Sequence, residues 1–396
     1  MSSKRIYSGL AAGLAMVLAV MCAGRTVYGQ DHELRGMACF EPTDEAPYGN
    51  WAQPKEGFFI TFDGLFWHIS APPKTSIGDP TLTPTVYDAA GNESVERNGM
   101  DTGEFRAKWK GGNRIELGWV DGHHGFLLST IHMNSQTEIL NARSVPVVFN
   151  DPAFGSYGFH LLDIPFPENV TVNPSRPAFL GRAQVIFDTL TAENKTKLNG
   201  VEASYLYRPH QLHDGGTVEF LLGGRYVELD DDFLVSALGG NLWDSLWNTH
   251  TKNKIAGPQV GLRWVKPFGR FEFSGEGRFT AGINSQSVTQ DGVLASHLRA
   301  PNPLYLPTQM TATGFANSAS YTEFSPLVEF RVEGHYELSR LIKLKAGWTG
   351  IWMDNIARAS DMVDYTVPRM GITTANKGNE TSVFVNGFTL GLELNR

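Results

Sequence analysis

The residue types most capable of chemistry gather in one acidic run and one histidine downstream of it. Asp230, Asp231 and Asp232 are consecutive, and His250 follows within the same predicted loop. A histidine beside carboxylates could act as a general base, and three adjacent acids offer oxygen ligands to Ca²⁺. A solvated acidic loop explains the same residues without any chemistry, because acidic side chains are mostly exposed.

A second chemical candidate, the pair His123-His124, falls in a tight turn. Metal sites need ligands at other spacings, so we interpret the pair as turn residues. The sequence contains no Gly-x-Ser-x-Gly, His-Glu-x-x-His, phosphate-loop or paired-cysteine motif. We therefore expect no catalytic site, no cofactor and no metal.

The larger set of charged residues alternates with apolar residues along the chain. Such a two-residue period places one set of side chains on each face of a β-strand. Strand lengths of roughly nine to thirteen residues suit a tilted bilayer crossing better than a soluble secreted β-sandwich, which is the alternative. About ten strands are predicted, at residues 58–66, 105–119, 126–133, 201–208, 218–226, 260–264, 271–283, 328–338, 342–352 and 384–394.

The connections between these stretches alternate in length. Outer-membrane barrels have short periplasmic turns and long extracellular loops, so the alternation predicts a single antiparallel up-and-down transmembrane β-barrel. Residues 183–190 also resemble a strand, and counting them as a crossing would give twelve strands and break the alternation. We place them in the second long loop. The short links are 121–124, 210–216, 266–269 and 339–340, and the long ones are 70–104, 139–196, 230–256, 284–325 and 354–380.

The charged strand faces are expected to line the interior of this barrel. Opposite charges on neighbouring strands stabilise one another, and about ten strands enclose a narrow space. The arginines could attract anions in a pore or could pair with the acids and fill it. The lumen-facing candidates are Glu202, Arg208, Glu219, Arg225, Arg263, Glu272, Glu276, Arg278, Glu329, Arg331, Glu333, Lys343 and Lys345.

Aromatic residues near strand ends predict girdles where lipid meets water. In the third long loop, Trp243 and Trp247 repeat at helical spacing. They could form a short helix over the barrel mouth, acting as a constriction or a ligand platform, or they could serve local packing. The girdle candidates are Tyr205, Tyr207, Tyr226, Trp264, Trp348 and Trp352.

The N-terminal segment predicts export. Lys4 and Arg5 precede an apolar run that ends near residue 22, and a small-residue cleavage site follows, so residues 1–29 are interpreted as a cleaved signal peptide. Residues 30–56 then form a flexible lead-in, and residues 57–396 form the barrel. With 33 Lys+Arg against 41 Asp+Glu, the acidic chain is a poor nucleic-acid binder. The expected partners are outer-membrane lipid and the barrel-assembly machinery.

Several stretches resemble the beta-barrel porin-like outer-membrane family of planctomycetes. Residues 200–208 are similar to its entry strand, 221–230 (LLGGRYVELD) to its L-x-G-x-R-Y-x-x-L signature, and 253–261 (NKIAGPQVG) to its N-x-F-x-G-x-Q-x-G signature. Residues 344–367 resemble its closing region, although Arg358-Ala359-Ser360 stands where the family tends to have Arg-Pro-Gly. The resemblance covers mainly residues 105–133 and 197–370 and implies a signal-bearing outer-membrane barrel.

The last strand also resembles a barrel-assembly signal. Thr389, Gly391 and Leu394 fit its order of polar, glycine and apolar residues, while Arg396 replaces the usual terminal aromatic.

Three functions remain in view. The first, favoured by family analogy, is a small-bore channel for ions or small solutes. The second is a non-conducting structural or surface-binding barrel of the adhesin or receptor kind, whose long loops contact ligands. The third, with least support, is a barrel hydrolase.

Overall fold

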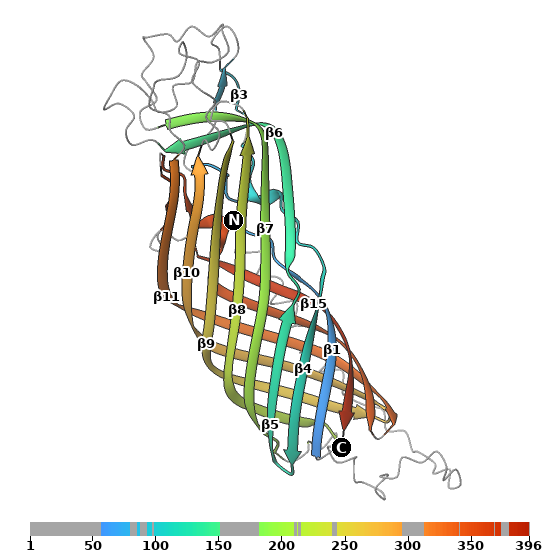
Figure 1. Ribbon diagram of the computed structural model, residues 1–396. Helices are drawn as coiled ribbons and strands as arrows, with labels where there is room; N and C mark the ends of the chain where they lie inside the picture. The colour runs from blue at the N-terminus through green and yellow to red at the C-terminus, as the bar shows by residue number, and fades with distance from the viewer. Residues whose placement is uncertain are drawn as a thin grey trace, which may run out of the picture.

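The computed structural model describes residues 57–79, 85–87, 93–96, 99–150, 182–209, 212, 215–239, 244–294, 313–339, 341–367, 369–373 and 380–395. Ten strands close into an antiparallel ring, in which β1 pairs with β15 and β5 pairs with β7 (Figure 1). The ring is formed by β1 (Gly57–Ile69), β4 (Lys110–Asp121), β5 (His124–Met133), β7 (Arg182–Tyr207), β8 (Thr217–Leu238), β9 (Ser245–Phe268), β10 (Phe271–Leu294), β11 (Thr313–Ser339), β12 (Ile342–Ala357) and β15 (Glu380–Asn395). The predicted ten-strand, all-β barrel is confirmed.

Tight turns join the strands at one end of the barrel, which we call the turn end. Gly122, between β4 and β5, and Gly269, between β9 and β10, have φ values of 55° and 60°. Glycine adopts this left-handed conformation at little cost, so both hairpins can reverse within two residues. These links lie where the short turns were predicted.

The outer face of the barrel next to the turn end is apolar. Phe58, Phe388 and Leu390 have exposed fractions of 68%, 59% and 69%, and such large apolar residues recur on every neighbouring strand. A soluble monomer rarely exposes so much contiguous apolar surface. This surface is the lipid-facing band of a transmembrane barrel.

Beyond this band, β7 to β11 continue as a tall wall on one side of the molecule, whereas β1, β4 and β15 end earlier (Figure 1). A tilted bilayer crossing takes roughly 9–11 residues. β7 has 26 residues and β11 has 27. Together with β6 (Gln136–Asn150), which pairs with the first part of β7, the parts of these strands beyond the band form what we call the extension.

The amphipathic pattern inverts where the extension begins. On β8 the outward side chains are apolar up to Tyr226, and the next outward ones are Glu228 and Asp230. The inward side chains change the opposite way, from Arg225 to apolar residues such as Phe233. The extension therefore carries polar residues toward water and an apolar core on its inner side.

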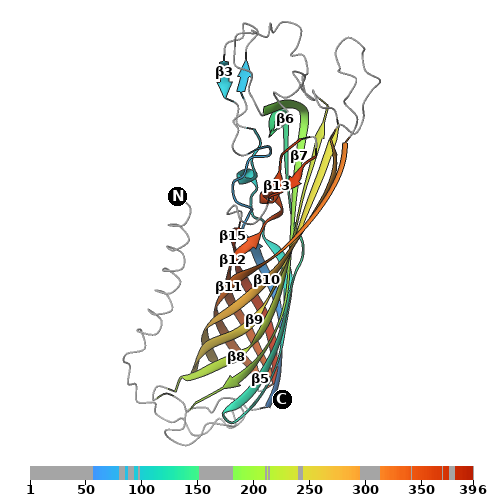
Figure 2. The same ribbon diagram turned by 90° about the vertical axis from the view of Figure 1, so that its left-hand side faces the viewer.

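Segments between the ring strands pack against that inner side (Figure 2). They include residues 71–79, the 3₁₀ turn η1 (Thr102–Glu104), the 3₁₀ turn η2 (Ala359–Asp361) and the short strands β13 (Val363–Asp364) and β14 (Gly371–Ile372). A separate hairpin pairs β2 (Thr85–Tyr87) with β3 (Glu93–Glu96). Among the described residues, no helix is long and apolar enough to cross a membrane.

Three loop predictions were wrong in extent. Residues 139–150 and 182–196, 230–238 and 245–256, and 284–294 and 313–325 are strand rather than loop. Residues 183–190 belong to β7, so they form neither a loop nor a separate crossing. These parts of the strands were taken for loops because their pattern is inverted. Outside the lipid, the apolar residues face inward, whereas the prediction looked for strands with apolar residues facing the membrane.

Candidate functional site: the barrel lumen

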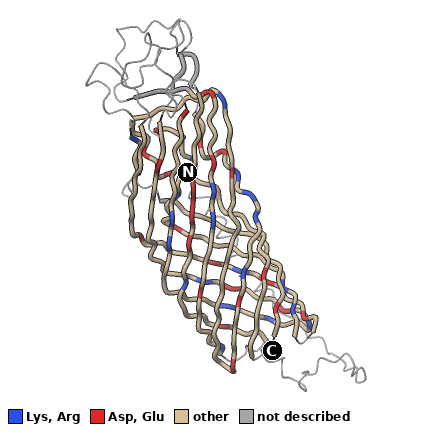
Figure 3. The backbone as a smooth tube through the Cα atoms, viewed as in Figure 1, with Lys and Arg blue, Asp and Glu red and all other residues tan. Residues whose placement is uncertain are grey.

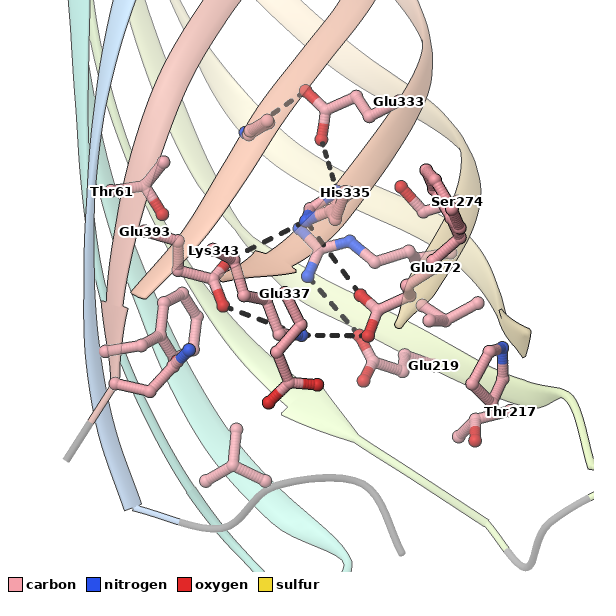
Figure 4. A pocket seen from close by; sticks show the side chains of 18 of the residues that line it. Thr61, Thr217, Glu219, Glu272, Ser274, Glu333, His335, Glu337, Lys343 and Glu393 are labelled. Atoms are coloured by element: carbon pink, nitrogen blue, oxygen red, sulfur yellow. Dashed lines mark hydrogen bonds and ion pairs between the residues drawn. The ribbon is translucent and has the colours of Figure 1, made fainter. Parts of the chain in front are cut away.

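The lumen opens at the turn end into a cavity of about 190 Å³ lined by charged and apolar side chains, which we call the vestibule (Figure 4). Acids and bases from several strands converge on it. Lys343 on β12 lies 2.8 Å from Glu272 on β10 and 3.8 Å from Glu393 on β15. Arg263 on β9 lies 3.3 Å from Glu219 on β8. The mouth thus carries both signs of charge in cross-strand pairs.

His335 lies in the same vestibule with both ring nitrogens lacking a hydrogen-bond partner among the described residues. Three carboxylates surround the ring at 3.7–3.9 Å, from Glu272, Glu333 and Glu393. Dashed lines in Figure 4 mark these contacts. These distances exceed direct hydrogen-bond length, so the ring is held among acids without being fixed by any one of them.

Deeper in the lumen, a layer of buried ion pairs fills the barrel; we call it the ion lattice. Arg114 lies 2.9 Å from Asp63 and 3.1 Å from Glu333, and Lys345 lies 3.1 Å from the same two acids. These side chains come from β1, β4, β11 and β12. Figure 3 shows acidic and basic positions on neighbouring strands in this part of the barrel.

The other side of the ion lattice is formed by β7, β8, β10 and β11. Arg278 pairs with Glu202, and Glu329 pairs with both Arg225 and Arg331. Arg331 also lies 2.7 Å from Glu116 across the lumen. All of these side chains are buried. Removing either partner of a pair would leave a buried charge uncompensated, so the loss of a single member of the lattice is expected to destabilise the barrel strongly.

An apolar layer lies next to the ion lattice, on the side facing the extension. Its members point inward from most of the ring strands and are buried. An apolar constriction of this kind disfavours water and ions. The layer consists of Leu65, Trp67, Ile69, Ile131, Met133, Leu198, Val227, Leu229, Ile255, Leu327, Ile351, Met353, Ile356, Val383 and Val385.

The last residues of β12 (355–357) and the described residues that follow it (358–367 and 369–373) fold against the inner side of the wall; we call them the closing segment. Asn355 has φ 55°, and its carbonyl accepts from Gln286 Nε2 at 2.8 Å and from Ser325 Oγ at 2.9 Å. Two residues later, the backbone N–H of Ala357 donates to Asn253 Oδ1 at 2.9 Å. Side chains of the wall therefore satisfy the backbone of the segment as it turns inward.

A buried ion pair holds the closing segment to the wall. Arg358 Nε donates to Asp231 Oδ2 at 3.0 Å, and both side chains are at most 1% exposed. Asp231 also accepts from Thr196 Oγ1 at 2.6 Å and from the backbone N–H of Ala359 at 3.1 Å. Arg358 Nη1 donates to the carbonyl of Ser70 at 3.1 Å. One guanidinium thus joins β8, β7 and the residue after β1.

Asp361, in the same segment, accepts from Thr75 Oγ1 at 2.6 Å. Burial raises the pKa of its carboxyl to about 6, an effect that the hydrogen bond from Thr75 and the charge of Arg358 only partly offset. At the outer end, Trp247 is fully buried and packs edge-on against Tyr365, with ring centroids 6.2 Å apart. The closing segment is therefore anchored by an ion pair, a carboxyl group and an aromatic core.

The structure places twelve of the thirteen lumen candidates on the inner face of the ring strands, and Arg208 directly after the end of β7 in the lining of the vestibule. Eight of them form the ion lattice, namely Glu202, Arg225, Glu276, Arg278, Glu329, Arg331, Glu333 and Lys345. The remaining five, Arg208, Glu219, Arg263, Glu272 and Lys343, line the vestibule. Their role in passing solutes stays a prediction.

The six girdle candidates lie on the outer face, at different heights. Tyr205, Tyr207 and Trp264 lie near the turn end, while Tyr226 and Trp352 lie toward the extension with Trp348 between them. Phe126, which pairs with Trp119, stacks on Trp119 and meets Tyr205 edge-on.

Of the two alternatives for the paired tryptophans, the helix is wrong at Trp247, which lies on β9 and packs into the core of the extension. Trp243 lies outside the described residues. The acidic run and His250 are also on strands rather than in a loop. Asp232 and His250 face outward 2.6 Å apart, whereas Asp231 faces inward to Arg358. The run therefore does not converge on one site.

Sequence reasoning missed Asp63, Arg114 and Glu116 as members of the ion lattice. They stand at the charged positions of the alternating stretches 58–66 and 105–119, so the same alternation that identified the other lumen residues could have identified them. It also missed Arg358, which no alternation marks. Among the described residues, no group of three or more His, Cys, Asp or Glu side chains could hold a metal ion.

The family model described as "Putative beta barrel porin-7 (BBP7)" matches residues 82–395. The chain belongs to this family. The ten-strand ring with its lipid-facing band agrees with the barrel architecture that the family description gives, and the chain is a β-barrel of the porin kind. No curated protein matches the sequence.

Among solved structures, the chain is similar to the "CymD monoaromatic hydrocarbon channel" at 7% identity and a TM-score of 0.21, covering 87% of this chain and 90% of that one. It is similar to a Pseudomonas aeruginosa FadL homologue at 8% identity and 0.20, covering 85% and 89%. An anion-selective porin from Comamonas acidovorans matches at 10% identity and 0.15, covering 86% and 98%. TM-scores this low support no conclusion about the solute of the BBP7 barrel.

Proposed function

We propose that this barrel is a small-bore channel for ions or small solutes, closed in the conformation described. The observation that supports it best is the vestibule, an open cavity at the turn end that leads directly onto the charged inner face. Conduction would require the ion lattice to rearrange, the apolar layer to wet and the closing segment to move. Each of these is a change of side-chain packing or of one anchored segment, and none requires the ring to open.

Planar-bilayer conductance of the detergent-folded barrel tests this proposal. Small, discrete, salt-dependent steps are expected. Arg225→Gln and Arg331→Gln should shift selectivity toward cations, because each removes a positive charge from the lumen. The matched control is Arg143→Gln, which removes the same charge from an exposed position on β6 in the extension.

A non-conducting structural or surface-binding barrel is the second candidate. It is favoured by the filled lumen, in which paired ions and an apolar layer occupy successive levels. The extension would then be the functional part, presenting its loops to ligands. Silence from barrels whose insertion is verified would contradict the channel and leave this candidate.

The remaining parts of the proposal concern export and class. Residues 1–29 would be removed as a signal peptide, and the barrel-assembly machinery would insert the ring with the extension facing outward. The barrel would have no enzymatic activity. Its source would be a planctomycete, as the resemblance to the family members of that group implies. Mass determination of the mature chain purified from outer membranes tests the cleavage, since a mass that includes residues 1–29 would contradict it.

A further inference from the structure

His335 is a buried histidine whose ring lines the vestibule without a hydrogen bond. It lies on β11 and is 9% exposed, and neither ring nitrogen has a hydrogen-bond partner among the described residues. A neutral imidazole needs a donor at one nitrogen and an acceptor at the other, whereas the protonated ring needs an acceptor at both. The groups that surround the ring therefore decide which of the two forms the vestibule suits.

Carboxylates face both nitrogens of the ring (Figure 4). Nδ1 lies 3.9 Å from an oxygen of Glu272 on β10 and 3.9 Å from an oxygen of Glu393 on β15. Nε2 lies 3.7 Å from an oxygen of Glu333 on β11 itself. Ionised carboxylates accept hydrogen bonds but donate none, and they attract a positive ring at these distances. The surroundings therefore suit the protonated ring on both sides.

The basic side chains nearest the ring are paired with acids. Lys345 stands opposite His335 in the register of β11 and β12, and its ammonium group lies 3.1 Å from both Asp63 and Glu333. The ammonium group of Lys343, also on β12, lies 2.8 Å from a carboxylate on β10. These ammonium groups repel a positive ring, but each lies directly against a carboxylate that offsets its charge.

The vestibule is close to electrical balance, so one proton changes its character. Among the described residues, its lining has six glutamates, including Glu337 on β11, against five arginines and lysines. The lining therefore carries a net charge of −1 when the ring is neutral and no net charge when the ring is protonated. Charged side chains around a narrow mouth select between cations and anions. Histidine is the side chain that ordinarily changes its charge between about pH 5 and pH 8.

We propose that His335 sets the preference of the vestibule for cations over anions by binding a proton. The neutral ring leaves a mouth that favours cations, and the protonated ring removes this preference. The site consists of the ring and its three carboxylates, from Glu272, Glu333 and Glu393. The consequence for conduction rests on the proposed channel function, whereas the change in the potential of the vestibule does not.

Charged thiol reagents measure this potential without any need for conduction. Ser274 lines the vestibule and stands opposite Glu333 in the register of β10 and β11. Ser274→Cys places a thiol there, in a full chain that also carries Cys22→Ser and Cys39→Ser. The rates of modification by a cationic and an anionic methanethiosulfonate are compared at low ionic strength, because their ratio cancels the ionisation of the thiol.

Coulomb's law gives the expected size of the effect. In water, a unit charge changes the local concentration of a monovalent ion by roughly fivefold at 4 Å and by about twofold at 8 Å. For two reagents of opposite sign, the ratio of rates therefore changes by about fivefold at the larger distance. In Ser274→Cys, the cation-to-anion ratio should fall by about this factor between pH 8 and pH 5.5.

Variants of the ring separate its proton from those of the glutamates. Adding His335→Gln should hold the ratio at its high value throughout the pH range, and His335→Lys should hold it at the low value. The matched control is His132→Gln, which removes a histidine from the outer face of β5 and should keep the full pH dependence. In the unmodified barrel, NMR signals of the ring protons, assigned by their loss in His335→Gln, should shift over the same range.

A ring that keeps one protonation state between pH 8 and pH 5.5 would overturn the inference, and so would an equal fall in the ratio after His335→Gln. Either result would stand even if the barrel conducts. Conversely, a barrel that is silent in planar bilayers but whose thiol ratio depends on His335 would contradict the proposed channel and support the proton site. In a conducting barrel, the reversal potential should show the same loss of cation preference in acid, and His335→Gln should abolish that change.

Discussion

Breaking the ion pair between Asp231 and Arg358 should release the closing segment from the wall. In the Asp231→Asn variant, the Arg358 guanidinium stays buried without its counter-charge. Thr196 and the backbone N–H of Ala359 donate to different oxygens of Asp231, so the amide of the variant can accept from one of them but not from both. The change therefore removes the charge and one acceptor, and it leaves the shape of the site nearly unaltered.

The size of the effect follows from the burial of the pair. Removing one partner of a buried ion pair costs about 3–5 kcal/mol, because the remaining charge is desolvated and uncompensated. Both side chains are at most 1% exposed, so solvent screening does not reduce this range appreciably. At 1.36 kcal/mol per tenfold change, the equilibrium between docked and undocked closing segment shifts by roughly two to four orders of magnitude.

Hydrogen–deuterium exchange with mass spectrometry measures this shift locally. Peptides from residues 355–373 should exchange faster in Asp231→Asn, while peptides from β1 and β15 keep their protection. Asp232→Asn is the matched control, because it changes the next residue on the outer face of the same strand. The double variant Asp231→Asn/Arg358→Met should regain part of the protection, since it no longer buries a charge.

Two results would refute this reasoning. Unchanged exchange in residues 355–373 of the folded Asp231→Asn variant would show that the ion pair does not hold the segment. Equal acceleration in Asp232→Asn would show that any loss of charge on β8 loosens the wall.

Three further predictions concern the extension. Trp247→Ala should cost about 3–5 kcal/mol because the side chain is fully buried, and protease cleavage should increase within the extension but not within the ring. Asp361 has its pKa raised to about 6 from the ordinary 3.8, so its folded form favours the proton. This proton should stabilise the docked closing segment by about 3 kcal/mol in acid, and the stabilisation should be lost as the pH rises through 6. Hydrogen-exchange protection factors of the segment measure the change, and Asp361→Asn should remove most of this pH dependence. Asp232→Asn should lower the pKa of His250, as followed by NMR titration of the ring protons.

The ring could be predicted from the sequence because lipid imposes one simple rule. Outward positions must be apolar or small, and every second residue of 271–283 and 328–338 is apolar or glycine. The turns could also be predicted from the sequence, since Gly122 and Gly269 supply the left-handed conformation that tight hairpins need. These signals are local, so no knowledge of the partner strands was required.

The extension and the closure of the lumen could not be predicted in the same way. Leu229, Phe233 and Trp247 are inward and apolar, which reverses the rule that identified the membrane strands. The pairing of Arg358 with Asp231 joins residues 127 positions apart through a segment with no periodicity. Such contacts depend on how the wall curves, and a single sequence does not encode that curvature in any short pattern.

The seam between β1 and β15 has a consequence for how the barrel can be made. It pairs Phe59 with Asn395, so the first and last strands of the ring meet only when the whole chain is present. Until then the sheet is an open ribbon with two unpaired edges, each a template for wrong pairing with another chain. Closing so large a loop is entropically slow, and the strands between the edges are long and rich in apolar residues. The growing sheet therefore has to be protected from other chains until it closes. Pairing of the sixteen residues of β15 with β1 covers the two exposed edges and completes the barrel.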